Sequence, residues 1–199
     1  YEVIVLMLIG ETATIVSIIL IFFYIFLRFR DWRFSLGTIF SLVHDVFVTL
    51  AVFSFFRHIM PFPLEIDQHF IAAILTVVGF SMNDTVVVFD RIREYSRTMK
   101  GESKPRIIDA AINDTLSRTV MTSVTVFIVL LVLFIFGGEV TRGFSFAMLI
   151  GVITGIYSSI FVAAPILVDF AKDKPLGKLT PEETKQRAKA KQAAAAAAH

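Results

Sequence analysis

The chain has 199 residues, of which 56% are hydrophobic and 18% are charged, and it contains 21 Phe and no Cys. Soluble domains carry roughly 45–50% apolar and about 25% charged residues, so this composition is unusual for a soluble domain. Because Cys is absent, a disulfide framework and a thiolate metal site are both excluded.

Five long windows that contain little charge follow one another along the chain. A bilayer core of about 30 Å needs roughly 20 apolar residues in a helix. The five windows meet this requirement and cover residues 3–27, 34–56, 69–89, 119–136 and 144–168. We therefore expect an all-α polytopic membrane protein whose transmembrane domain comprises residues 1–170.

The connections between the windows differ in charge and length. Pro61 and Pro63 keep the connection between the second and third windows non-helical. The longest connection, residues 91–117, is mixed in charge, and its second part, residues 107–116, has helical spacing and is expected to lie along the membrane surface. Gly137, Gly138 and Glu139 predict a tight turn between the fourth and fifth windows.

Lysine and arginine are distributed unevenly between the connections. All of them except Arg57 and Arg142 follow the first window, separate the third window from the fourth, or lie in the carboxyl-terminal tail. The positive-inside rule therefore predicts a cytoplasmic basic tail over residues 171–192 and an amino terminus outside. This topology explains the sequence pI of about 9.0 without a nucleic-acid partner.

The two ends of the chain lead to two further predictions. An outside amino terminus that begins in an apolar run, without a basic leader or cleavage site, indicates that an earlier span precedes this segment in a longer polypeptide. Residues 193–199, six alanines and a histidine, are expected to be a tag or a remnant outside the fold.

Catalytic motifs of the common enzyme classes are missing from the sequence. It has no glycine-rich phosphate loop, no His pair at metal-ligand spacing and no Gly-x-Ser-x-Gly elbow. Ser158 and Ser159 could suggest an intramembrane protease, but a serine nucleophile needs a suitably placed base. We expect no catalytic residues, no metal and no cofactor other than protons.

Ionisable residues within the windows are the informative feature. A charged side chain near a helix centre costs about 2.5–3.5 kcal/mol on insertion scales, so it is usually kept for a pair, a cavity or a proton path. Asp84 lies in the third window beside Asn83, and Asp90 lies near the inner boundary. A buried carboxylate suits a proton carrier. The structural alternative for Asp84 is a helix–helix hydrogen bond.

Arg118, at the start of the fourth window, is the nearest candidate cation for Asp84. Arg118, Thr122 and Thr125 have the spacing i, i+4 and i+7, which places one polar stripe on an apolar helix. A guanidinium stays protonated, so it would tune the carboxylate without carrying the proton. Alternatively, Arg118 is an anchor whose side chain extends to lipid headgroups.

Other polar and small residues in the windows have weaker signals. His44 and Asp45 lie near the middle of the second window, and either could relay protons or hold a helix contact. Glu11 is more simply interpreted as a structural residue near the outer boundary. Gly151 and Gly155, extended by Ser159, have the small-residue spacing that lets helices pack closely. Packing is therefore their expected role.

Four stretches of the sequence resemble the SecD/SecF protein-export family of the proton-driven RND superfamily. The His-Asp, Asn-Asp-Thr and Leu-Ser-Arg-Thr motifs favour its SecF side. Asp114 departs from the family pattern, where Gln is usual, and adds a negative charge near Arg118. The stretches that carry the resemblance are 32–45, 72–94, 115–123 and 137–160.

The resemblance implies five transmembrane helices of a six-helix RND-type half, with a first span and an extracytoplasmic domain missing. Such a half pairs with a SecD half in the bacterial or archaeal cytoplasmic membrane and assists the SecYEG translocon. Proton flow between the halves then moves the extracytoplasmic domains that contact preproteins. The resemblance places Asp84 and Arg118 on the proton path, supported by Asn83, Thr122 and Asp90. The alternatives are a non-conducting scaffold of the translocon and an RND-type exporter of small hydrophobic molecules.

Overall fold

The computed structural model describes residues 2–62, 64–99 and 101–171, without the side chains of residues 2–11, 13, 14 and 171. The predicted tail (residues 171–192), apart from residue 171, and the predicted remnant (193–199) lie outside this range, as does the side chain of Glu11. The described residues are helical, with turns between helices and no strand. The elements are α1 (Glu2–Phe29), α2 (Trp32–Phe56), α3 (Gln68–Thr98), α4 (Lys104–Phe136), α5 (Glu139–Ser158), the π-helical turn η1 (Ser159–Ala163) and α6 (Ala164–Ala171).

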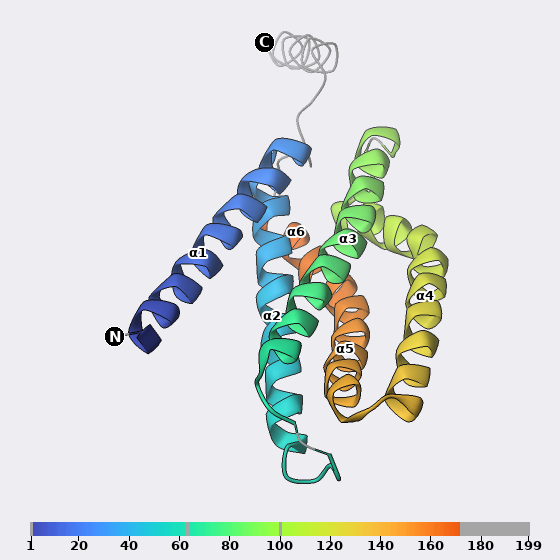
Figure 1. Ribbon diagram of the computed structural model, residues 1–199. Helices are drawn as coiled ribbons and strands as arrows, with labels where there is room; N and C mark the ends of the chain where they lie inside the picture. The colour runs from blue at the N-terminus through green and yellow to red at the C-terminus, as the bar shows by residue number, and fades with distance from the viewer. Residues whose placement is uncertain (1, 63, 100, 172–199) are drawn as a thin grey trace, which may run out of the picture.

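The helices form an elongated bundle in which α5 packs against α2, α3 and α4 (Figure 1). α1 packs on α2 and leans away from the rest of the bundle. Four described helices are long and apolar enough to cross a membrane: α2, α3, α4 and the continuous rod Glu139–Phe170. The described apolar stretch of α1, Ile15–Phe29, is shorter than these four. The all-α expectation is therefore confirmed, with four of the five expected crossing helices.

The outer surface of the bundle is apolar. Phe47, Leu75 and Phe136 are 70%, 72% and 82% exposed. Exposed apolar side chains in such numbers are costly in water and normal in contact with lipid, so this surface agrees with a membrane-embedded bundle.

Short polar turns fix the starts of two helices. The Asp31 side chain accepts a hydrogen bond from the backbone N–H of Arg33 at 3.2 Å and begins α2. Asp67 accepts one from the backbone N–H of Phe70 at 2.9 Å and begins α3. An acceptor at this position satisfies an amide that has no partner within the helix. Gly137 and Gly138 separate α4 from α5, as predicted.

The connection predicted over residues 91–117 is mostly helical. α3 continues to Thr98 and α4 begins at Lys104, with Pro105 in its first turn. Ile107, Ile108 and Ala111 are buried against the bundle, so residues 107–116 are continuous with the predicted fourth span and do not form a separate helix. The first turns of α4 run across the end of the bundle before the helix turns along it (Figure 1).

One end of the bundle, termed the basic end, contains the carboxyl ends of α1 and α3 and the starts of α2 and α4. Phe29, Phe34 and Phe89 anchor one hydrophobic cluster there. Phe53 and Phe70 belong to a second cluster, toward the opposite end. Between the two clusters lies a layer of buried polar side chains from α2, α3, α4, α5 and η1. This layer contains Ser41, Asp45, Ser81, Asp84, Thr85, Thr119, Ser158 and Ser159.

The predicted fifth span is one rod interrupted by the π-helical turn η1. Pro165 follows this turn and has no N–H to donate to the carbonyl of Phe161, while its ring crowds that carbonyl. A wider turn before Pro165 relieves both problems, which accounts for η1. The turn comes directly after Ser158 and within the level of the polar layer.

Candidate functional site

Two aspartates are buried in the polar layer. Asp45, in the middle of α2, is fully buried, and Asp84, in α3, is 9% exposed. The helical phase of each residue directs its side chain into the bundle, whereas Asn83, beside Asp84, lies on an exposed face of α3. A carboxylate removed from water needs hydrogen-bond donors or a proton. The hydrogen-bond partners of the two aspartates therefore determine whether this layer can bind a proton.

Asp84 has one hydrogen-bonded oxygen and one without a partner. The Thr119 hydroxyl of α4 donates to Asp84 Oδ1 at 2.8 Å. Asp84 Oδ2 is buried and has no hydrogen bond within 3.5 Å to a described residue, although the Ser159 hydroxyl lies near enough to act on this carboxylate. A buried carboxylate oxygen without a donor is a position where a proton can bind. This geometry gives Asp84 the chemistry of a proton acceptor.

Arg118 lies next to Thr119 but on an exposed face of α4. It forms no ion pair with Asp84 in the described part of the chain, although its charge acts on that carboxylate over a longer range. Thr122 is also exposed, and its hydroxyl donates to the Arg118 carbonyl of its own helix at 3.0 Å. The structure thus brings Asp84 together with Thr119 and leaves Arg118 and Thr122 at the surface.

Thr119 was not among the residues predicted for this site. It follows Arg118 in a stretch that contains several hydroxyl side chains, and the sequence does not show which of them faces α3. One feature of the sequence could have indicated Thr119. Arg118 and Thr119 are adjacent in a helix, where neighbouring side chains point about 100° apart, so only one of the two can face Asp84.

Both carboxylate oxygens of Asp45 contact a polar side chain, unlike those of Asp84. Ser81 of α3 donates a short hydrogen bond to Asp45 Oδ2. His44 Nδ1 lies 3.4 Å from Asp45 Oδ1, so the two adjacent side chains predicted as relay candidates contact each other. The His44 side chain is 32% exposed, and its ring lies 6.0 Å from the Tyr157 ring. His44 therefore links a fully buried carboxylate to the surface of the bundle.

Hydroxyl pairs connect α5 and η1 to both aspartate-bearing helices. Ser41 of α2 donates to Ser158 at 3.0 Å, and Thr85 of α3 lies 2.9 Å from Ser159, oxygen to oxygen. Ser158 and Ser159 also donate to the Gly155 carbonyl, at 3.2 and 2.9 Å. The sequence predicted only a packing role for Ser159, and its hydrogen bonds place it in the polar layer.

The glycines predicted for packing lie where α5 meets α3. A Cβ at Gly151 would be 2.1 Å from Val77 Cγ2, and one at Gly155 would be 3.2 Å from Ser81 Cβ. Both positions allow α5 to approach α3 more closely than a larger residue would. This close approach brings Ser159 within reach of Thr85.

Asp90, predicted as a supporting residue, is outside this layer. Its Oδ2 lies 2.6 Å from Arg28 Nη2 at the basic end. Asp114, which departs from the family pattern near Arg118, pairs instead with Arg91 of α3, which also binds Glu94 at 2.6 Å. The charged residues of the basic end therefore form ion pairs between helices that are separate from the polar layer.

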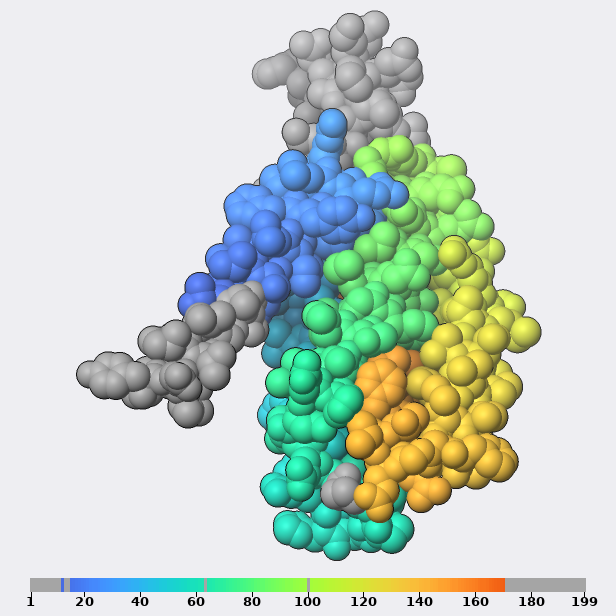
Figure 2. All heavy atoms as spheres, in the orientation of Figure 1, coloured from blue at the N-terminus to red at the C-terminus, as the bar shows by residue number. Residues whose placement is uncertain are grey.

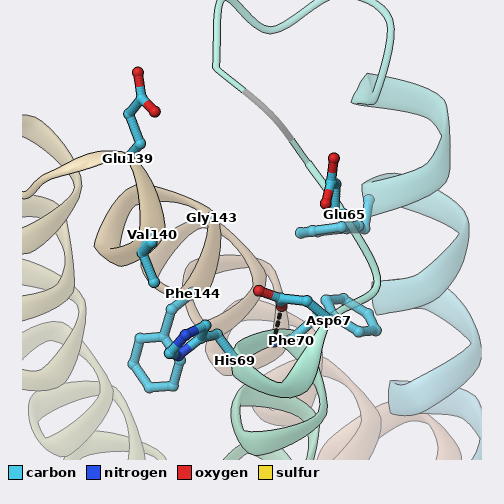
Figure 3. A pocket seen from close by; sticks show the side chains of 9 residues that line it. Glu65, Asp67, His69, Phe70, Glu139, Val140, Gly143 and Phe144 are labelled. Atoms are coloured by element: carbon cyan, nitrogen blue, oxygen red, sulfur yellow. Dashed lines mark hydrogen bonds between the residues drawn. The ribbon is translucent and has the colours of Figure 1, made fainter.

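A hollow at the opposite end lies apart from the buried aspartates. Its lining includes Glu65, His69, Phe70, Glu139 and Phe144 (Figure 3). Glu65 and Glu139 point away from the hollow, and the His69 ring lies beside Phe144. Among the described residues, no group of three His, Cys, Asp or Glu side chains has an arrangement that could hold a metal ion. We assign no chemistry to this hollow.

The chain is similar to known proteins in sequence and in fold. Residues 6–173 match the family described as protein export membrane protein SecD/SecF, C-terminal. The protein translocase subunit SecF of Rhodothermus marinus is 55% identical over 153 residues, which are 77% of this chain and 49% of that protein. The SecDF subunit of Brucella abortus is 45% identical over 88% of this chain and 21% of its own length. The chain thus spans about half the length of the SecF relative.

Solved structures of SecDF share the fold. A crystal structure of SecDF from Thermus thermophilus, a translocon-associated membrane protein, has a TM-score of 0.73 and 39% identity over 80% of this chain and 21% of that chain. A second structure, SecDF in its super-membrane-facing form, has a TM-score of 0.70 and 36% identity over 92% of this chain and 22% of that chain. The chain is therefore a multi-pass membrane protein that belongs to the SecD/SecF protein-export family, on its SecF side.

Proposed function

We propose that this chain is the membrane part of a SecF-type subunit that assists the Sec translocase and uses proton flow to promote preprotein export. Its partners are a SecD half and the SecYEG channel, and preproteins are its cargo. In this proposal α1 also crosses the bilayer, giving five crossing helices of an RND-type half. The basic end faces the cytoplasm, where the positive-inside rule places arginine.

The observation that carries the proposal is the environment of Asp84. One of its oxygens accepts from Thr119, and the other is buried without a donor among the described residues. Proton binding at the second oxygen removes a charge from a low-dielectric helix contact, which changes the relative stability of helix arrangements around it. A transmembrane carboxylate with this geometry can therefore convert proton uptake into helix movement.

Asp45 and His44 form the second part of the proposed relay. Asp45 is bound by Ser81 of the same helix that carries Asp84, and His44 is the partly exposed group beside it. Because His44 lies between the buried Asp45 and the surface of the bundle, it suits the entry or exit of a proton. Arg118 biases the charge state of Asp84 from the surface of α4.

The absence of an Arg118–Asp84 ion pair in the described part favours a relay over a fixed scaffold. A scaffold that depended on a salt bridge between these residues would hold them in contact. Exchanging the two residues, with Asp84→Arg and Arg118→Asp in one chain, tests this point. A scaffold held by this salt bridge tolerates the exchange without loss of stability, whereas the arrangement of a buried Asp84 and an exposed Arg118 does not.

The direct test is Asp84→Asn in the full-length protein, measured as proton-dependent preprotein export into inverted membrane vesicles. Asn keeps the size and the acceptor for Thr119 but cannot ionise, so we expect export stimulation to be lost while the subunit still assembles. Asp109→Asn is the matched control, because Asp109 is an exposed acid of α4 outside the polar layer. Normal proton-dependent export by Asp84→Asn would refute the proposal.

A further inference from the structure

Four arginines from two helices gather at the basic end. Arg28 lies in the last turn of α1, Arg30 follows that helix, and Arg93 and Arg97 lie in the last turns of α3. Asp90, Arg93 and Arg97 have the spacing i, i+3 and i+7, so they share one face of α3. This group of arginines is termed the arginine cluster.

Two contacts show that this face of α3 meets the end of α1. Arg28 Nη2 lies 2.6 Å from Asp90 Oδ2, and Arg93 Nη1 donates to the Arg28 carbonyl at 3.3 Å. The charges of Arg28, Arg30 and Arg97 all act on Arg93. The four guanidinium groups are therefore close enough to influence one another electrostatically.

The positive charge of the cluster is not balanced by the described residues. Asp90 is the carboxylate that acts on Arg93, and it is already paired with Arg28, while Glu94 binds Arg91. Arg30 and Arg97 are exposed and form no ion pair with any described residue. Arg93 Nε is buried without an acceptor in the same part of the chain. The cluster consequently has guanidinium donors that lack an anion.

The surroundings of the cluster indicate where that anion comes from. Toward the middle of the bundle, the last turns of α1 expose Phe23 and Leu27, which are 55% and 71% accessible. α1 packs on α2 and leans away from α3 toward its amino end (Figures 1 and 2). Trp32, at the start of α2, is 46% exposed, as is typical of a residue at the membrane–water boundary.

We propose that Arg28, Arg30, Arg93 and Arg97 bind the phosphate headgroup of an anionic phospholipid whose acyl chains lie along the exposed apolar face of α1. Guanidinium groups match the geometry of phosphate oxygens and hold them with paired hydrogen bonds. Basic sites between transmembrane helices are suited to anionic headgroups. The lipid supplies the acceptor that Arg93 lacks, and its acyl chains cover exposed apolar side chains of α1 such as Leu27.

The test compares the binding of phosphatidylglycerol and phosphatidylcholine to the detergent-purified full-length protein by native mass spectrometry. Arg30→Asn and Arg97→Gln each remove a charge without removing a hydrogen bond seen in the structure, and Asn tolerates the positive φ of 55° at Arg30. We expect each single variant to weaken phosphatidylglycerol binding about fivefold, and the double variant about twenty-five-fold. Phosphatidylcholine binding should not change.

A matched double variant controls for the loss of charge. Arg57→Gln with Arg142→Gln removes the same number of arginines from the opposite end of the bundle, and we expect unchanged phosphatidylglycerol binding. Three results would overturn the proposal: unchanged binding in Arg97→Gln, an equal loss in the control, or inorganic phosphate competing as tightly as the intact lipid. The last result would mean a site for free phosphate.

Discussion

The Ser159 hydroxyl lies 2.9 Å from the Thr85 hydroxyl, across the contact between the π-helical turn and α3. Ser158, the preceding residue, reaches Ser41 of α2 at 3.0 Å. Two adjacent residues thus bind the two helices that carry the buried aspartates. In the proposed relay, a movement of α2 or α3 would be transmitted through these contacts to the rod formed by α5, η1 and α6.

Pro165→Ala tests the origin of the π-helical turn. The substitution restores an N–H and removes the ring, so the rod can continue as a regular α-helix. Losing the turn would rotate α6 by about 100° relative to α5, which moves Leu167 out of the core. We expect the free energy of unfolding in detergent to fall by about 1–3 kcal/mol, together with lower export activity.

Pro105→Ala is the control for that prediction. Pro105 lies in the first turn of α4, where a missing N–H costs nothing, so stability should change little. If Pro165→Ala behaves like Pro105→Ala, the packing of α6 imposes the turn and Pro165 does not.

Gly151→Ala tests the close approach of α5 and α3. The added Cβ would lie 2.1 Å from Val77 Cγ2 and 2.6 Å from Cγ1, so α5 and α3 must separate. Overpacking of this kind costs about 1–3 kcal/mol, which unfolding by added denaturing detergent can measure.

Gly79→Ala is the matched control, because it lies in α3 and its added Cβ would meet nothing within 4 Å. There the substitution should leave stability unchanged or raise it by up to about 1 kcal/mol, since Ala favours the helix. Equal effects at positions 79 and 151 would contradict the packing described for α5 and α3.

The buried aspartates and the membrane-length helices could be predicted from the sequence because both are local signals. Asp84 is conspicuous in an apolar stretch, and a run of apolar residues indicates a span without knowledge of its neighbours. The partner of Asp84 could not be predicted in this way. The choice between Arg118 and Thr119 depends on how α4 is rotated against α3, and that rotation follows from packing along the whole helix.

The linking role of Ser158 and Ser159 was missed for a related reason. A Tyr-Ser-Ser sequence in an apolar helix looks the same whether its hydroxyls bind their own backbone or a neighbouring helix. Pro165 is a local signal for a disturbed helix, but it does not reveal which neighbours the preceding residues will face.

Thr119→Val tests whether the hydrogen bond to Asp84 matters for the relay. Val keeps the shape of Thr but removes the donor to Asp84 Oδ1. A hydrogen bond to a charged group contributes about 1.5–3 kcal/mol, so we expect proton-dependent export to slow about tenfold or more. Thr119→Ser, which keeps the hydroxyl, should recover most of the rate.

A double-variant comparison separates this effect from general destabilisation. If Thr119 acts through the charge of Asp84, Thr119→Val should lower the free energy of unfolding less in the Asp84→Asn variant than in the wild-type chain. Additive losses would show that Thr119 acts independently of the carboxylate.

Asp45→Asn distinguishes a proton carrier from a structural residue at the second buried aspartate. Asn can still accept from Ser81, so a purely structural Asp45 should tolerate the change with little loss of stability or export. A proton-carrying Asp45 should lose proton-dependent export while the free energy of unfolding stays near the wild-type value. Asp45→Leu provides the comparison: it leaves Ser81 without its acceptor, which costs about 1–3 kcal/mol in unfolding measurements whichever role Asp45 has. Full export by Asp45→Asn, together with destabilisation by Asp45→Leu, would restrict the relay to Asp84 and leave Asp45 as a helix contact.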